Sequence, residues 1–203
     1  MLRKTLKNLK GKITQEQKEA IRSTPFYDIG AFEVLNSSKT RLKALVECYN
    51  PVTMSFDFGE GISLRFEPRE FSVVMGLHFR GQYVNPDLVE QPSPIVGRYF
   101  SGEFGNVTRK NIVSALGRIA GTEHSEDFAK VFILLVFNTV LFPTSSNATP
   151  SYVVHYVDDL SVIGEYAWGP AVATFLMKSM RRHLDTGKSY MDGCTIGLMV
   201  SLM

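Results

Sequence analysis

One segment of the sequence is apolar on nearly every face of the helix that it predicts. We expect this helix to begin at Ser125 as its N-cap, with acidic residues in the first turn, where the positive helix end favours them. Its apolar residues are Phe128, Val131, Phe132, Leu134, Leu135, Val136, Phe137, Val140 and Leu141. A helix that is apolar all round is buried at the centre of a fold. We therefore predict a core centred on Phe132, Leu135 and Phe137.

Length and composition suit one domain, or at most one and a fraction. The chain has 203 residues, of which 44% are hydrophobic and 21% charged, so a core can form without metals or disulfides. Its two cysteines, Cys48 and Cys194, are far apart and belong to no Cys/His cluster. The longest uncharged apolar run, 131–143, is shorter than the ~20 residues that span a bilayer, and no signal peptide precedes it. We expect a soluble, intracellular domain that binds no cofactor.

The remaining periodicity predicts an α+β fold, a predominantly helical single domain over 14–203 with one small β-hairpin at about residues 53–66. Thr14 and Gln17 fit a capping box at the start of a helix that continues to about Ser23. Within 53–66, two short runs of alternating apolar residues flank a glycine turn, which is typical of a hairpin.

Further helix signals follow the hairpin. Pro68 fits a first helical position, and Gly76 fits the left-handed residue after that helix. Thr108 fits an N-cap, and Gly169-Pro170 opens a long amphipathic helix. Ser38 can cap an earlier helix. Residues 80–106 are rich in Pro and Gly, so we expect irregular structure with short turns there. The chain stops inside another apolar segment, which suggests a C-terminally truncated domain or a short family member.

Tyr156-Val157-Asp158-Asp159 matches YxDD, the metal-binding turn of reverse transcriptases. In those enzymes the two aspartates join a third carboxylate and hold Mg²⁺. The flanking residues predict helix and turn rather than paired strands, and four-residue motifs often match by chance. We therefore expect Asp158 and Asp159 to cap helices or turns, and keep a Mg²⁺-dependent enzyme as a third hypothesis.

Other short motifs also lack the context that their chemistry requires. Gly187-Lys188-Ser189 resembles the end of a phosphate-binding Walker A loop, but Arg182 occupies the position of the required glycine. Residues 123–127 include His124 and several acidic residues, yet helix capping explains them better than a metal site does. The four histidines are dispersed, and nothing favours a catalytic triad. The sequence predicts no enzyme active site.

Basic residues are concentrated in the first part of the chain. Residues 1–22 contain seven basic and two acidic side chains, a net charge of +5, while the whole chain carries +2. Residues 1–13 form a basic N-terminal arm with apolar residues at helical spacing. Such an arm can pack as a solvated helix on the domain, lie on a membrane surface, target an organelle or bind phosphates. Its candidate nucleic-acid-binding residues are Arg3, Lys4, Lys7, Lys10 and Lys12.

The order of several short segments resembles the plant mobile domain family, over a stretch from about residue 13 to the end. The resemblance rests on LVECYNP at 45–51, SFDFGE at 55–60, LRFEPREF at 64–71, GL at 76–77, VLFP at 140–143, DL at 159–160 and YAWG at 166–169. The third segment is also similar to a sister domain of plant Mutator-like transposon proteins, where it lies beside ubiquitin-like-protein protease domains. The early end at Met203 departs from the family, which usually continues through another helix.

This resemblance implies a transposon-encoded or domesticated plant protein that is nuclear, or alternatively cytoplasmic. It implies a role in transposon control, gene silencing and gene expression, or development. The family carries no established catalytic residues, and its older aminotransferase-like label finds no cofactor-phosphate loop here. The leading hypothesis is therefore a non-enzymatic protein-interaction module with an unidentified protein partner. The second is nucleic-acid binding through the basic N-terminal arm.

Overall fold

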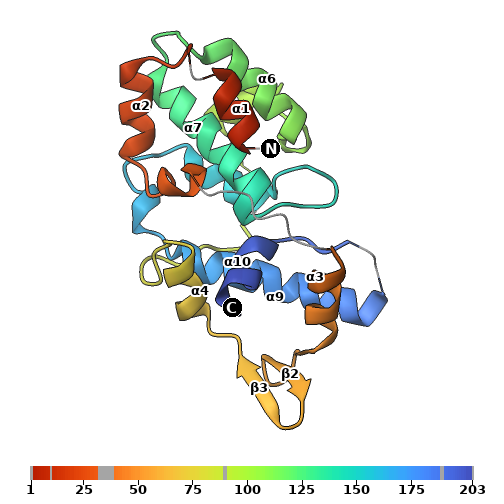
Figure 1. Ribbon diagram of the computed structural model, residues 1–203. Coiled ribbons are helices and arrows are strands. Elements are labelled where there is room, and N and C mark those ends of the chain that lie inside the picture. The colour runs from red at the N-terminus through yellow and green to blue at the C-terminus, as the bar shows by residue number, and fades with distance from the viewer. Residues whose placement is uncertain (1, 10, 32–38, 89–90, 188–189, 203) are drawn as a thin grey trace.

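The computed structural model describes residues 2–9, 11–31, 39–88, 91–187 and 190–202, and it shows helices arranged in two layers (Figure 1). The upper layer of Figure 1 contains α1 (Leu2–Leu9), α2 (Gln15–Arg22), α6 (Arg109–Ile119) and α7 (Ser125–Val136). The lower layer contains α3 (Lys39–Glu47), α4 (Pro68–Val74), α9 (Trp168–Thr186) and α10 (Thr195–Ser201). A small sheet extends from this lower layer, away from α7.

Short elements connect these layers. They are α5 (Pro94–Tyr99), α8 (Ser151–Val154), the π-helix η3 (Phe137–Leu141) and the 3₁₀ helices η1 (Asp28–Ala31), η2 (Phe104–Asn106), η4 (His155–Val157) and η5 (Ile163–Glu165). Among the described residues, no helix is both long enough and apolar enough to cross a membrane. The predicted α+β, mostly helical fold is confirmed.

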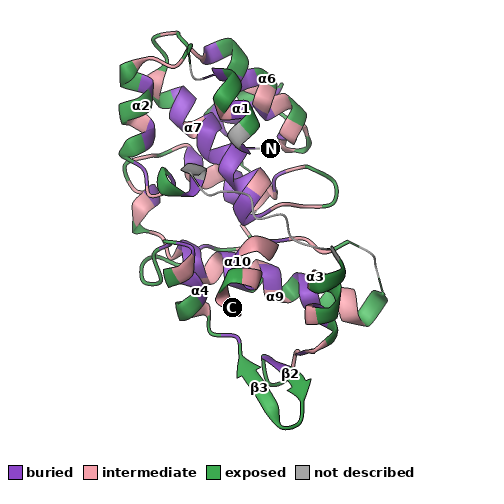
Figure 2. Ribbon diagram, in the orientation of Figure 1, coloured by how far each residue is buried: buried purple, intermediate pink, exposed green. Residues whose placement is uncertain are grey.

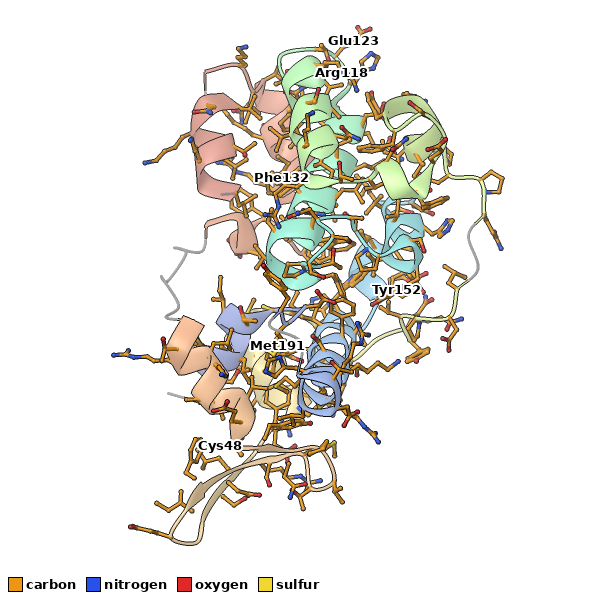
Figure 3. All side chains as sticks on the ribbon, turned by 90° about the vertical axis from the view of Figure 1, so that its right-hand side faces the viewer. Cys48, Arg118, Glu123, Phe132, Tyr152 and Met191 are labelled. Atoms are coloured by element: carbon orange, nitrogen blue, oxygen red, sulfur yellow. The ribbon has the colours of Figure 1, made fainter. Side chains whose placement is uncertain are left out.

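Helix α7 is the centre of the upper layer, as the sequence predicts. It packs between α2 and α6, and its purple ribbon in Figure 2 shows that burial continues along its length. Phe132, Leu135 and Phe137 are all buried, and Figure 3 shows Phe132 pointing among the surrounding helices. The helix continues directly into the π-helical turn η3. Burial of these side chains is the main source of stability in this layer.

A buried glutamine joins α2 to the end of α6. The predicted capping box is present, because Gln17 and Thr14 each bond the other's backbone N–H. The same Gln17 side chain donates to the carbonyls of Ile119 (2.8 Å) and Thr122 (3.0 Å) and accepts from the Gly121 N–H (3.2 Å). One buried side chain therefore bonds three backbone groups at the end of α6 and ties α2 to that end.

An aromatic cluster connects the two layers. Trp168, the first residue of α9, is fully buried, and its indole N–H donates to the Ile163 carbonyl at 2.7 Å. Its ring lies 4.9 Å from Phe137 and 5.5 Å from Phe26, centroid to centroid. Phe26 in turn meets Phe137 edge-on at 5.1 Å. These contacts fix the start of α9 against the end of α7.

The predicted hairpin is present, and a third strand joins it. β2 (Ser55–Gly59) pairs antiparallel with β3 (Ile62–Arg65), and β1 (Tyr49–Asn50) pairs with the other edge of β2. Phe56 and Phe66 are buried, and Phe66 lies 5.7 Å from Phe71 of α4. The outer apolar residues are exposed, because the hairpin extends beyond the helices (Figure 2). They are Met54, Phe58, Ile62 and Leu64.

Two local predictions differ from the structure, and a third cannot be compared. His124, not Ser125, occupies the N-cap of α7, and Ser125 is its first residue. Within 80–106 the chain forms α5, whose N-cap Ser93 accepts from the Val96 N–H at 3.3 Å. Six residues are too few to show a helical period, so the Pro/Gly-rich composition hid this helix. The predicted N-cap at Ser38 lies outside the described residues.

Candidate functional site along helix α9

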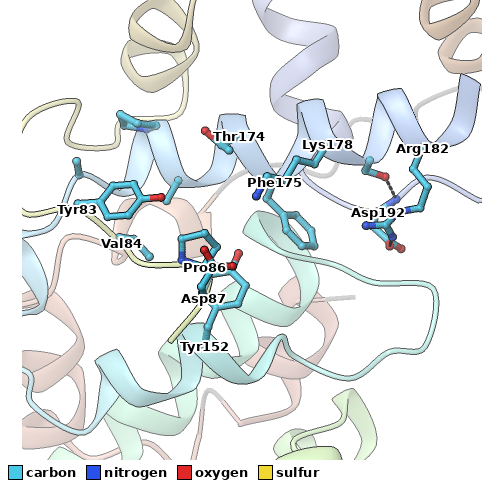
Figure 4. Close-up of a pocket in the computed structure, with 14 residues that line it drawn as sticks. Tyr83, Val84, Pro86, Asp87, Tyr152, Thr174, Phe175, Lys178, Arg182 and Asp192 are labelled. Carbon is cyan, nitrogen blue, oxygen red and sulfur yellow. Dashed lines mark hydrogen bonds and ion pairs between the residues drawn. The ribbon is translucent and has the colours of Figure 1, made fainter. Parts of the chain in front are cut away.

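A groove with a volume of about 260 Å³ runs along α9. Pro170, Thr174, Lys178 and Arg182 follow one another at four-residue intervals, so they lie on one face of the helix and form one wall (Figure 4). The other wall is the extended segment 83–87 together with Tyr152 of α8. Residues far apart in the sequence therefore build one concave surface.

Aromatic side chains line the middle of the groove. Phe175 of α9 and Tyr152 of α8 both pack against Phe142, at 5.5 Å and 6.2 Å between ring centroids. Burial, together with the neighbouring phenols of Tyr156 and Tyr83, raises the pKa of Tyr152, so its hydroxyl stays neutral at physiological pH. Tyr83 is 76% exposed at the rim. The groove thus combines ordered aromatic walls with one aromatic ring that solvent reaches.

Charged and polar groups define one end of the groove. Arg182 and Asp192 form an ion pair at 3.6 Å. Asp192 also accepts from the Ser145 N–H, and its own N–H donates to the buried Ser179 hydroxyl, both at 2.7 Å. Lys178, one helical turn before Arg182, has no ion-pair partner among the residues that the structure describes. A fixed polar end and an unpaired cation therefore border the aromatic middle.

The size and lining of this groove suit one or two protein side chains. Pockets for drug-sized ligands usually measure ~300–1,000 Å³, and this one is smaller. Aromatic walls with a charged rim are typical of the pockets that receive anchor residues at protein interfaces. The arrangement can hold an apolar side chain in its middle and a carboxylate beside Lys178.

The basic N-terminal arm is a helix that packs on the domain where the structure describes it. Leu2 and Leu9 of α1 are buried in the core, while Lys4 and Lys7 are exposed. Lys12, after the helix, is exposed as well. None of these three lysines lines the groove. Lys10 and the side chain of Arg3 lie outside the described part of the chain.

The aspartates of the YxDD motif bond backbone groups nearby. Asp158 accepts from the Ile95 N–H at 3.1 Å, in the first turn of α5. Asp159 accepts from both the N–H and the hydroxyl of Ser161, at 2.9 and 2.6 Å. Those two bonds hold the pKa of Asp159 below its usual range. No group of three His, Cys, Asp or Glu side chains within the described ranges is placed to hold a metal ion.

The other short motifs are also placed at helix ends. Gly187 is the left-handed residue that ends α9, with φ of 63°, whereas Lys188 and Ser189 lie outside the described residues. Glu126 pairs with Lys130 at 2.7 Å across one turn of α7. Asp127 is bonded by Arg98 and Tyr99 of α5.

Comparison with known proteins places the chain in a family. A family model described as "Domain of unknown function (DUF8566)" matches residues 2–199. The chain belongs to this family. The match includes the basic N-terminal arm as well as both helical layers, so it spans nearly all of the described structure.

A curated relative is the Arabidopsis thaliana protein named Maintenance of Meristems. The two sequences are 26% identical over 199 residues, which cover 90% of this chain and 41% of the relative. The chain thus spans about two fifths of that relative's length. No solved structure matches the chain. The similarity to a plant protein is shown, and the more specific resemblance to the plant mobile domain stays a prediction.

The sequence indicated none of the groove residues as functional. Its walls come from 83–87, Tyr152, α9 and Asp192, and no local pattern reveals that these segments meet. Two signals in the sequence could have indicated the groove. On α9, the polar residues Thr174, Lys178 and Arg182 recur at four-residue intervals on a face other than the buried stripe of the helix. Outside α9, Tyr83 is a large aromatic residue in a Pro- and Gly-rich segment.

Proposed function

We propose that this chain is a non-enzymatic protein-interaction module of a plant nuclear protein that acts in development. The similarity to a protein named for the maintenance of meristems supports the developmental role. The resemblance to transposon-derived plant domains supports the nuclear location, with the cytoplasm as the alternative. A role in transposon control or gene expression is compatible with the same module.

The observation that carries this proposal is the groove along α9. Its aromatic walls are already ordered by Phe142 behind them, so a partner side chain would enter with little loss of conformational freedom in the groove. Lys178 lies next to these rings without a partner among the described residues. We infer an occupant with an apolar anchor residue followed or preceded by an acidic one.

The test compares groove variants with matched controls in pull-downs from plant nuclei, followed by reconstitution with the purified partner. Lys178→Glu reverses the charge beside the groove, and Lys110→Glu makes the same change on α6. Tyr83→Ser removes a rim ring that is 76% exposed, and Tyr190→Ser removes one that is 75% exposed outside the groove lining. Both groove variants should weaken partner binding about tenfold or more. Equal binding by all four variants, or no reproducible partner at all, would refute the proposal.

Nucleic-acid binding is the second candidate function, and the exposure of Lys4, Lys7 and Lys12 favours it. Because α1 buries two leucines, deleting the arm would also damage the core. The sharper variant replaces these three lysines with Gln and leaves the helix in place. Fluorescence titration with single- and double-stranded DNA and RNA should then show weaker binding and a shallower salt dependence than the unchanged chain. Salt-independent or absent binding by the unchanged chain rejects this function.

A further inference from the structure

Residues 78–82 form a short loop whose two ends are fixed to the segment 163–169. Five hydrogen bonds hold it. At the first end, the His78 carbonyl accepts from the Gly169 N–H (3.0 Å), and His78 Nδ1 bonds the Gly164 carbonyl (2.8 Å). At the other end, the Gln82 N–H and Nε2 donate to the carbonyl and the carboxylate of Glu165 (both 2.8 Å), and the Gln82 carbonyl accepts from the Ala167 N–H (2.9 Å). Gly81 lies so close to this segment that a Cβ there would be 2.2 Å from the Glu165 carbonyl oxygen. The loop is therefore rigidly placed.

The tip of this fixed loop exposes an aromatic ring and a cation. Phe79 is 40% exposed and Arg80 is exposed beside it. Together with His78 and with Arg69 from the first turn of α4, they line an open pocket of about 370 Å³. Neither arginine forms an ion pair or a hydrogen bond with any described residue. Two guanidinium groups thus share one hollow without a counter-charge.

The imidazole of His78 anchors the loop at the edge of the same pocket. The Gly164 carbonyl can only accept, so His78 Nδ1 carries the donated proton. This bond fixes the ring against the segment 163–169, and with the proton on Nδ1 the other nitrogen, Nε2, can only accept, so His78 holds the loop in place and does not itself bond a phosphoryl oxygen. The two guanidinium forks of Arg69 and Arg80 are the groups that proteins use to bind phosphoryl oxygens.

The surroundings of the pocket favour one compact dianion over a polyanion. Glu70 and Glu165 are exposed but do not line the pocket, Glu165 is bonded by Gln82, and Arg65 is already paired with Glu67 at 3.5 Å. The pocket lining contains two arginines and no extended basic stripe of the kind that the successive phosphates of a nucleic-acid backbone need. A phosphate monoester carries about −1.5 to −2 charges on one group, which matches two unpaired arginines.

We propose that Arg69 and Arg80 bind a phosphate monoester on a side chain of a protein partner, with Phe79 contacting the apolar part of that side chain. The inference rests on the proposed function, because it assumes that the partner is a protein. It uses none of the residues that line the groove along α9. The module would then recognise its partner in a phosphorylation-dependent manner.

The test is an NMR titration of the full chain with phosphoserine and with phenyl phosphate. Saturable shifts are expected at the backbone amides of residues 79–82 and at the Nε–Hε groups of both arginines. Arg69→Gln and Arg80→Gln should each weaken binding about tenfold. The control Arg181→Gln, which removes an exposed arginine outside the pocket, should leave binding unchanged. Phenyl phosphate should bind more tightly than phosphoserine if Phe79 takes part.

Three outcomes would overturn the assignment. Shifts that do not saturate, or that persist in both arginine variants, exclude a phosphate site here. A single-stranded oligonucleotide without a terminal monoester that binds these residues more tightly than phosphoserine would replace the proposal with nucleic-acid binding. Preferential binding to vesicles that contain anionic lipid would replace it with a membrane surface. Because none of these measurements involves Lys178 or Tyr83, a failure here leaves the groove proposal standing.

Discussion

Single residues decide how closely the helices of the lower layer approach. Gly169, at the start of α9, lies against α4, and a Cβ there would be 1.9 Å from the Ser72 hydroxyl oxygen and 2.4 Å from the Ser72 Cβ. The Ser72 side chain is buried and donates back to the Pro68 carbonyl. Rotation of the hydroxyl alone cannot relieve such a contact. The α4–α9 interface therefore requires glycine at this position.

Gly169→Ala should destabilise the protein by about 1–3 kcal/mol, because the added methyl group overpacks the interface. Urea unfolding followed by circular dichroism measures the change. Gly117→Ala is the matched control, since Gly117 is exposed in α6 and a Cβ there meets nothing within 4 Å. That variant should gain up to about 1 kcal/mol from helix propensity. Equal effects of the two substitutions would contradict the close packing of α4 on α9.

At the scale of elements, a charged network fastens the short helix α5 to α7. Arg98 and the Tyr99 hydroxyl both donate to Asp127, the hydroxyl at 2.7 Å. Burial alone would raise the pKa of Asp127, but these two bonds, with the nearby charges of Arg98 and Lys130, outweigh it and hold the pKa below its usual range. The ionised carboxylate thus stabilises the folded state.

The pH dependence of stability follows from the lowered pKa of Asp127. A carboxyl group whose pKa falls on folding stabilises the folded protein at pH values above its pKa in the unfolded chain, which is about 3.9 for Asp. This stabilisation is lost as the pH falls through the pKa of the group in the folded protein. Asp127→Asn should therefore lower the free energy of unfolding by about 1 kcal/mol or more at pH 7. The difference from the unchanged chain should narrow below about pH 4. A difference that is the same at pH 7 and pH 3 would show that the charge contributes nothing.

The elements that the sequence predicted are those with local signals. The caps at Thr14 and Thr108 depend on neighbouring residues alone, and both are present. The central helix and the hairpin follow from periodicity. Helix α5 was missed because it is shorter than two turns, and β1 because two residues show no alternation. The groove along α9 depends on segments that meet only after folding, so no pattern within one segment predicts it.

At the scale of the whole molecule, α10 covers α4, so that the last described helix of the chain shields part of the core. Gly197 packs directly on Phe71 of α4 and on Met75, the C-cap residue of that helix. Cys194, at the N-cap of α10, is fully buried with its sulfur 3.9 Å from that of Met75. Burial raises the pKa of Cys194 to about 12. The Cys194 thiol therefore stays protonated and inaccessible while α10 is docked.

Cys194 should be labelled by thiol reagents only when α10 separates from α4. In a Cys48→Ser variant, labelling of Cys194 at pH 8 should be slow and should accelerate steeply with urea. The reason is that the thiolate can form, and the reagent can reach it, only after α10 separates from α4. The complementary Cys194→Ser variant reports the half-buried Cys48 and should react faster under native conditions. Rapid labelling of Cys194 without urea would contradict the docking of α10.

The central claim is that a protein partner binds in the groove along α9, and site-specific photo-crosslinking tests it most directly. A photo-crosslinking amino acid replaces Thr174 in the groove, and in a second protein it replaces Lys110 on α6. We predict that position 174 captures one protein reproducibly, that the same crosslink forms with that partner purified, and that Lys178→Glu abolishes it in both settings. Capture of the same proteins from both positions, or a product that survives Lys178→Glu, would contradict the claim.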